Sequence, residues 1–225
     1  MHKKDIKVFS INTELNKVTG VQKVLVDIHN GIRDEYDAKI VGTVSFSNID
    51  PHNKVKKDEY IRFCNPFVLR NSVVLVHERL MSSILLLLNS LLFLNLRIIY
   101  IHHSLYSKGD KLTFFPKNIV AISDRGIKNL TDFFRVPLNN ITKIHNGIRD
   151  EWSDKFKTEE KRKNKVIKVL FPARINSIKR QIEFVSKSQG NLNAEIQILF
   201  AGLGPDYSKL TEITKGNEQF ITLGF

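Results

Sequence analysis

A repeated alternation of short apolar runs and amphipathic segments constrains the fold of this chain more than any other feature. It is plainest in residues 166–204, where an amphipathic segment separates the apolar run 166–171 from a second run, 196–201. Short, β-branched and almost unbroken runs are typical of strands buried on both faces of a sheet. Between them, Ile182 and Val185 have the spacing of a helix with one apolar face. The stretch therefore predicts a β-α-β unit.

The same alternation recurs along the chain and predicts an α/β fold. The other expected strands span residues 6–11, 38–44, 60–63, 73–76, 98–101, 118–122, 141–144 and 220–223. Helical spacing of apolar residues occurs after residue 20, within 81–96, over 124–134 and after residue 205. Residues 150–165 are dense in charge and lack an apolar pattern, so we expect them to link a first domain, 1–149, to a second, 166–225.

The composition restricts the class of protein. The 225 residues are 42% hydrophobic and 26% charged, which suffices for one large or two modest domains. The single cysteine, Cys64, excludes an internal disulfide and offers no metal-ligand spacing, in keeping with a reducing compartment. The amino-terminal residues lack the apolar run of a signal peptide. We therefore expect a cytoplasmic protein.

The net charge of +12 implies attraction to something acidic: nucleic acid, anionic lipid or a phosphorylated substrate. The basic residues are spread along the chain, without the dense arginine tract or aromatic-interleaved motif of RNA-binding proteins. An enzyme resting peripherally on the anionic inner face of a membrane fits this distribution at least as well as a nucleic-acid binder.

Two cations follow the first strand of the second domain, where open α/β sheets bind ligands beyond the carboxyl ends of their strands. Arg174 comes just after that strand, and Lys179 comes five residues later, across the loop before the expected helix. The donor fork of an arginine and the point charge of a lysine suit the oxygens of one diphosphate. Two solvated surface cations are the alternative, and spacing alone does not decide between them.

Two residues of the first domain also stand where an element meets a loop. Gly20 lies at the start of a helix, where backbone N–H groups can face an anion. The alternative is that this glycine only allows the backbone to turn. His102 ends a strand and opens a loop, where a histidine can meet substrate and exchange protons near neutral pH. A packed loop histidine is the alternative.

Residues 81–96 hold the longest apolar segment, which Asn89, Ser90 and Asn95 interrupt. Its uninterrupted pieces are far shorter than the ~20 residues that a membrane span requires. The segment predicts a buried or interface-facing helix that runs into the strand 98–101. Contact of its leucine-rich face with a bilayer is the alternative.

Several segments in this order resemble the retaining, nucleotide-sugar-dependent glycosyltransferases of family four, over nearly all 225 residues. In the first half they are GVQK at 20–23, the strand 98–102 with its terminal histidine, NIVAIS at 118–123 and IHNGI at 144–148. In the second half they are LFPARINSIKR at 170–180, LFAGLGP at 199–205 and the strand 221–224.

The resemblance implies the GT-B fold, in which two Rossmann-like domains face each other, with a second domain that is incomplete here. It implies transfer of a sugar from a nucleotide-sugar donor to a glycan or lipid-linked acceptor, in the synthesis of a cell-surface polysaccharide. Such enzymes need no metal and no cofactor besides the nucleotide-sugar co-substrate, and no nucleic-acid partner is expected.

The resemblance also assigns roles by position. Arg174 and Lys179 would bind the donor diphosphate, and Gly20 would lie beside the diphosphate or the acceptor. His102 would be the catalytic residue, near the reacting sugar. The residues expected to bind the donor nucleotide are Gly202, Gly204 and Gly224.

The sequence departs from the family pattern in two ways. Ala173 and Arg180 replace the glycines that flank the arginine and the lysine, and both changes are tolerable. The family's acidic motif, two glutamates that hold the donor sugar and ribose, is expected after residue 225 and is missing. The resemblance therefore implies a fragment or a natural truncation of a transferase.

Other functions stay open at this stage. A catalytically inactive remnant would only bind a glycan or partner. Binding to nucleic acid would explain the positive charge of the chain. A nicotinamide-binding Rossmann protein is less favoured, because G-x-G-x-x-G does not follow the first strand.

Overall fold

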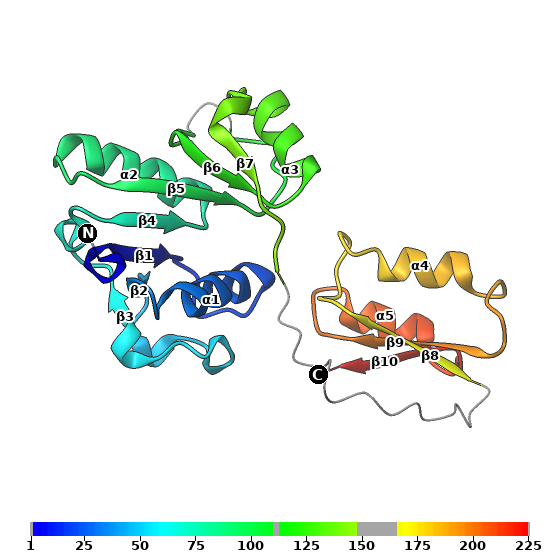
Figure 1. Cartoon of the computed structure of the whole chain (residues 1–225). Coiled ribbons are helices and arrows are strands. Elements are labelled where there is room, and N and C mark those ends of the chain that lie inside the picture. Colours follow the sequence, from blue (N-terminus) through cyan, green and yellow to red (C-terminus); the bar gives the residue numbers. More distant parts are fainter. Residues whose placement is uncertain (1, 110–112, 148–165, 225) are drawn as a thin grey trace. The chain divides into compact units, whose positions relative to one another are not determined.

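The computed structural model describes residues 2–109, 113–147 and 166–224 (Figure 1). The chain divides into two compact units, Met1–Arg149 (unit 1) and Asp150–Phe225 (unit 2), each with its own parallel sheet. The α/β fold predicted from the alternation of apolar runs is confirmed. The expected linker, residues 150–165, lies outside the described residues.

Unit 1 contains a seven-stranded sheet in which every neighbouring pair is parallel. In spatial order, its strands are β3 (Tyr60–Arg62), β2 (Asp37–Gly42), β1 (Lys7–Ile11), β4 (Val73–Val76), β5 (Arg97–His102), β6 (Asn118–Ala121) and β7 (Ile141–Lys143). From β1 the chain proceeds to one side of the sheet, and from β4 it proceeds to the other. The strand order therefore reverses between β1 and β4, whose carboxyl ends diverge into different loops.

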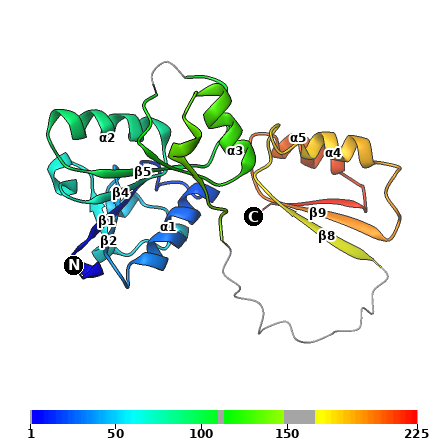
Figure 2. The same cartoon turned by 45° about the horizontal axis from the view of Figure 1, so that its top comes forward.

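Helices cover the two faces of this sheet (Figure 2). The longer helical elements are α1 (Gly20–Ile32), α2 (Arg79–Leu91) and α3 (Asp124–Lys128), which continues as a π-helical turn, Asn129–Phe133. Short 3-10 turns occur at Lys3–Asp5, Phe46–Asn48, Pro51–Asn53, Lys57–Glu59, Pro66–Leu69 and Leu138–Asn140. Ile40 and Val41 are adjacent on β2 but pack in different clusters, with α1 and α2 respectively, because successive strand side chains point to opposite faces.

The leucine-rich segment predicted to be one helix over 81–96 ends sooner. The side chain of Asn89 accepts a hydrogen bond from the backbone N–H of Leu96 at 2.9 Å and so closes the turn after α2. Phe93 and Asn95 adopt left-handed backbone conformations in that turn. None of the helices in the described ranges is long and apolar enough to cross a bilayer.

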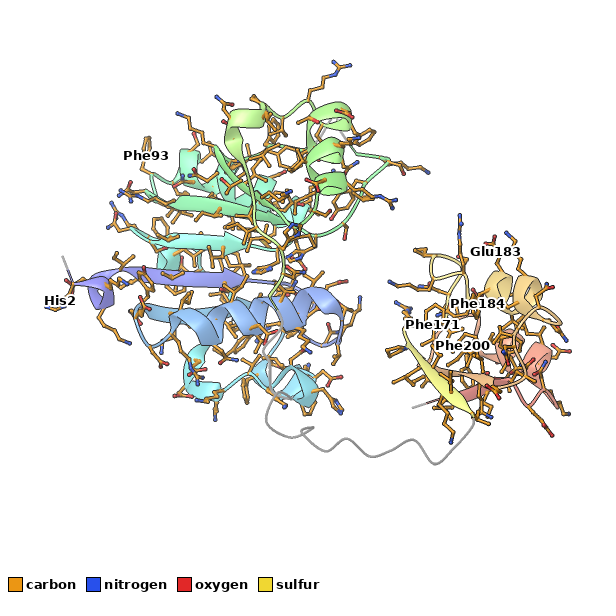
Figure 3. The ribbon with its side chains drawn as sticks, turned by 45° about the vertical axis from the view of Figure 1, so that its right-hand side comes forward. His2, Phe93, Phe171, Glu183, Phe184 and Phe200 are labelled. Atoms are coloured by element: carbon orange, nitrogen blue, oxygen red, sulfur yellow. The ribbon has the colours of Figure 1, made fainter. Side chains whose placement is uncertain are left out.

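Unit 2 contains a three-stranded sheet with helices packed on one face. Its elements are β8 (Ile167–Pro172), α4 (Gln181–Ser188), β9 (Ile196–Ala201), α5 (Tyr207–Thr214) and β10 (Phe220–Gly224). The strand order is β10-β9-β8, so β9 is central. Phe171, Phe184 and Phe200 lie together between the sheet and α4, with ring centroids 5.6 to 6.4 Å apart (Figure 3).

The prediction that residues 166–171 form a strand buried on both faces is wrong. β8 is an edge strand, and Ile167, Val169 and Leu170 are about half exposed. An unbroken apolar run is typical of a covered strand, and within the described part of unit 2 no helix covers the second face of this one.

Candidate functional site

A cavity of about 410 Å³ opens in unit 1 at the reversal of strand order, and we call it the switch-point cavity. It is lined by Asn12, Thr13, Glu14, Thr19, Val21, Gln22, His77, Glu78, Arg79, Leu80, Met81, Ile84, Ser104 and Tyr106. These residues follow β1, β4 and β5 or belong to the starts of α1 and α2. Open α/β sheets bind their ligands at this position.

The carboxylate of Glu78 ties the loop after β1 to the end of β4. It accepts hydrogen bonds from the backbone N–H of Thr13 at 3.0 and 3.1 Å, and from the Thr13 hydroxyl at 2.8 Å. Burial raises the pKa of Glu78, although these hydrogen bonds oppose the shift. The arrangement fixes an acceptor group in the wall of the cavity.

A second set of hydrogen bonds positions the start of α1. The Gln22 side chain, which is buried, donates to the side chain of Asn12 and to the carbonyl of Glu14, both at 3.2 Å. It also accepts from the hydroxyl of Thr19, the residue that caps α1. Gly20 follows as the first residue of the helix, and a Cβ there would meet no atom within 4 Å. The space beside Gly20 is thus open.

Two stacked histidines lie at the carboxyl ends of β4 and β5. Nδ1 of His77 is 2.9 Å from Nε2 of His103, and the ring centroids are 5.1 Å apart. Burial, and then mutual repulsion, lowers the pKa of His77 to about 3, and burial lowers that of His103 to about 4. Both rings are therefore neutral at pH 7. Nε2 of His77 is buried and has no hydrogen-bond partner among the described residues.

His102, the predicted catalytic residue, is not among the residues that line this cavity. Its side chain is 1% exposed and lies 3.2 Å from the hydroxyl of Tyr100, on the sheet face that α3 covers. A Cβ at Gly126 would stand 3.3 Å from its ring. Burial lowers its pKa to about 4. The catalytic role of His102 stays a prediction, and the ring that lines the cavity is that of His77.

Arg79 is held rigidly at the start of α2. Its guanidinium donates to the carbonyl of Gly109 at 2.6 Å and to the hydroxyl of Thr113. It also lies 4.7 Å from the ring centroid of Tyr106 and 5.5 Å from that of Phe134. The cavity therefore has one fixed positive charge in its wall.

In unit 2, the predicted phosphate ligands stand on one loop, between β8 and α4. The side chains of Arg174 and Lys179 are exposed, and neither has an ion-pair partner within the described ranges. The backbone of the loop is fixed: Gln181 donates to the carbonyl of Arg174 at 3.1 Å, and Asn176 accepts from the N–H of Lys179 at 3.0 Å. A cavity of about 310 Å³ beside it is lined by Ser177, Arg180, Asp206 and Lys209, among others.

The three glycines predicted to bind the nucleotide lie beside this loop, and the structure gives each a packing role. A Cβ at Gly202 would stand 2.2 Å from the carbonyl oxygen of Ala173, and one at Gly204 would stand 2.0 Å from that of Ile175. Gly224 has a φ of +70° and lies against Tyr207. Close packing of two loops explains why side chains are excluded, so nucleotide contact by these glycines stays a prediction.

The predicted site residues thus fall into two groups. The unit 2 group lies at the carboxyl end of its sheet and comprises Arg174, Lys179, Gly202, Gly204 and Gly224. Gly20 and His102 belong to unit 1, where the two neighbours of Gly20, Thr19 and Val21, line the switch-point cavity. The sequence analysis missed His77, Glu78 and His103. Two of these follow the strand 73–76 directly, and a polar pair at a strand's carboxyl end was the available signal.

Within the described ranges, no group of three or more His, Cys, Asp or Glu residues could hold a metal ion.

Comparison with models of protein families finds no match, and no curated protein matches the sequence. Solved structures do match. The chain resembles HepE from Anabaena in complex with UDP-glucose, with 13% identity and a TM-score of 0.71, over 98% of this chain and 69% of that one.

Two further structures are similar. The lipopolysaccharide outer core galactosyltransferase WaaB has 12% identity and a TM-score of 0.71, over 98% of this chain and 68% of WaaB. A UDP-N-acetylglucosamine 2-epimerase from Rickettsia bellii has 12% identity and a TM-score of 0.60, over 97% and 68%. At such identities the likeness shows the fold: a GT-B-like architecture with Rossmann-like units, of which the second is partial.

The packing of the glycines predicts a specific loss of stability. Gly204→Ala would force its Cβ into the carbonyl of Ile175 and destabilise unit 2 by about 2–3 kcal/mol, as overpacking does. Hydrogen exchange of the β9 amides measures this effect. Gly31→Ala, where a Cβ meets nothing within 4 Å, is the control and should cost nothing. Unchanged protection of β9 in Gly204→Ala would contradict the packing role.

The buried histidines predict a pH dependence of folding. Since the pKa values of His77, His102 and His103 are lowered in the fold, the unfolded chain binds more protons below pH 6.5. The free energy of unfolding of unit 1 should therefore fall from pH 6.5 to 5, by up to about 1.4 kcal/mol per pH unit for each histidine. Denaturant titrations at several pH values measure the slope.

A matched pair of variants tests the assignment. His103→Gln should reduce the slope between pH 6.5 and 5, whereas His52→Gln, which removes an exposed ring, should leave it as in the wild type. Equal slopes in all three proteins would show that the buried histidines do not control acid stability.

Proposed function

We propose that this chain is a glycosyltransferase, of the retaining type and family four, which transfers a sugar from a nucleotide-sugar donor to an acceptor. The likeness over 98% of the chain to HepE in complex with UDP-glucose is the observation that carries the proposal. Two exposed cations at the carboxyl end of the unit 2 sheet support it, because the donor diphosphate needs such partners.

In this proposal, unit 2 binds the donor. As the bond from the sugar to the nucleoside diphosphate breaks, negative charge grows on the departing phosphate oxygens. Arg174 and Lys179 stabilise that charge, because their loop is already fixed by Gln181 and Asn176 before the substrate arrives. The sugar carbon becomes oxocarbenium-like, as in glycoside hydrolysis. No metal or other cofactor is required besides the nucleotide-sugar itself.

Unit 1 binds the acceptor, a glycan or a lipid-linked sugar, in the switch-point cavity. Its wall offers the acceptor hydroxyls the carboxylate of Glu78, and the neutral side chains of His77 and Gln22 line the same wall. Polar groups with fixed geometry in a concave site provide specificity. We place the enzyme in cell-surface polysaccharide synthesis, in the cytoplasm at the inner face of the membrane, and expect no nucleic-acid partner.

Loss of the two cations should weaken nucleotide binding. We expect Arg174→Ala and Lys179→Ala each to reduce the affinity for UDP at least tenfold, measured by calorimetric titration of the 225-residue protein. Lys215→Ala removes an exposed lysine between α5 and β10, at the opposite end of the strands, and should leave the affinity unchanged. Equal losses in all three variants would indicate a general effect of charge, and absence of any binding of UDP, ADP or GDP would overturn the donor assignment.

A second experiment distinguishes sugar transfer from epimerisation and from binding without turnover. The protein is incubated with UDP-glucose and with UDP-N-acetylglucosamine, with and without a mixture of glycan and lipid-linked acceptors. A glycosyltransferase releases UDP in an acceptor-dependent manner. Conversion of the sugar nucleotide to its 2-epimer would assign epimerase activity instead, and binding without turnover would indicate an inactive remnant.

Gly20 supplies a test in unit 1. Gly20→Ala should leave the stability within about 0.5 kcal/mol of the wild type, because its Cβ meets no atom and alanine suits a helix. If the diphosphate or acceptor lies beside Gly20, the added methyl group should lower the rate of transfer several-fold. The control is Gly31→Ala in the same helix, with equally open space. Equal rates in both variants would remove Gly20 from the site.

A further inference from the structure

The helix α2 carries apolar side chains on its solvent side. Leu80, Ile84, Leu87 and Leu91 are 69, 39, 51 and 71% exposed. At 100° per residue, these four positions fall within one narrow stripe of the helix surface. Phe93, 81% exposed, follows the helix and projects outward from unit 1 (Figure 3). We call these five residues the α2 face.

The outer side of α2 lacks the charged residues of a helix that faces water. Its buried side includes Ser82 and Ser83, and the Ser82 hydroxyl has no partner among the described residues. Its only ionisable residue, Arg79, is held by contacts within unit 1. A surface helix of a globular protein normally turns charged and polar residues outward. The α2 face therefore fits contact with an apolar phase.

The α2 face is continuous with the candidate acceptor site. Leu80 and Ile84 belong to the stripe and also line the switch-point cavity. From Leu80 to Leu91 the stripe extends over about 17 Å at the rise of an α-helix. An apolar ligand or surface that covers the stripe thus reaches the mouth of the cavity.

Exposed cations flank both ends of α2. Lys108 precedes Gly109, whose carbonyl binds Arg79 at the start of the helix. At the other end, Arg70 and Arg97 adjoin the turn after α2, since Asn71 donates to the carbonyl of Leu94 and Arg97 to that of Ser72, both at 2.9 Å. An apolar stripe between cations is the pattern of a helix that lies in the interface of an anionic bilayer.

We propose that the α2 face lies on an anionic lipid surface, with Arg70, Arg97 and Lys108 at the level of the headgroups. A second copy of the chain is a poorer occupant, because both copies would bring a net charge of +12 to the contact. Where the proposed transferase function holds, this contact presents the cavity to the head of a lipid-linked acceptor. The membrane contact itself does not depend on donor binding.

Vesicle flotation of the 225-residue protein tests the proposal. We expect binding to vesicles of phosphatidylcholine with 30% phosphatidylglycerol, and weaker binding to phosphatidylcholine alone. Leu87→Gln/Leu91→Gln should lower the bound fraction on anionic vesicles at least tenfold. The control Leu138→Gln/Leu223→Gln changes two equally exposed leucines outside the α2 face and should bind as the wild type.

The remaining outcomes decide against the proposal. Wild-type binding by Leu87→Gln/Leu91→Gln, or no binding to either type of vesicle, would overturn it. Self-association of the wild type that this double variant abolishes, seen by sedimentation equilibrium, would assign the face to a second copy. UDP titration of the double variant is a separate readout: unchanged UDP affinity with lost flotation supports the proposal, and failure of UDP binding alone leaves it standing.

Discussion

Pairing between β1 and β4 is the constraint on which the rest of unit 1 depends. It places the first strand of one branch of the chain beside the first strand of the other, so that the loops after them separate and leave a space. Glu78 then spans this space to Thr13, and the capped start of α1 borders it. The order of the strands thus creates the switch-point cavity, and the local side chains only determine its lining.

Much of the fold could be predicted from the sequence, because a buried parallel strand needs a short apolar run and each run identified as a strand is one. Their ends differ from prediction by no more than two residues. Strand order could not be predicted, since it depends on contacts distant in the chain. The exposure of β8 could not either, because an apolar run looks the same at the edge of a sheet as in its middle.

The loop positions of the candidate residues could be predicted from the sequence, whereas the face of the sheet to which a strand residue points could not. Arg174 and Lys179 stand on one loop after a strand, as expected. His102 illustrates the other case. Because side chains along a strand alternate between the two faces of the sheet, His102 lies on the same face as Tyr100, beneath α3. His103 instead contacts His77 at the end of the neighbouring strand. Which of two adjacent histidines is covered by a helix follows from the side of the sheet on which that helix packs.

The contact of Gly202 and Gly204 with the carbonyls of the neighbouring loop has a consequence for how such a domain can diversify. Positions where no side chain fits cannot be varied to change what the domain contacts. Under the proposed donor-binding function, a change of nucleotide preference must come from the side chains of residues 176–180 and of α5. The two glycines therefore keep the packing of the two loops constant, while neighbouring side chains can vary without disturbing it.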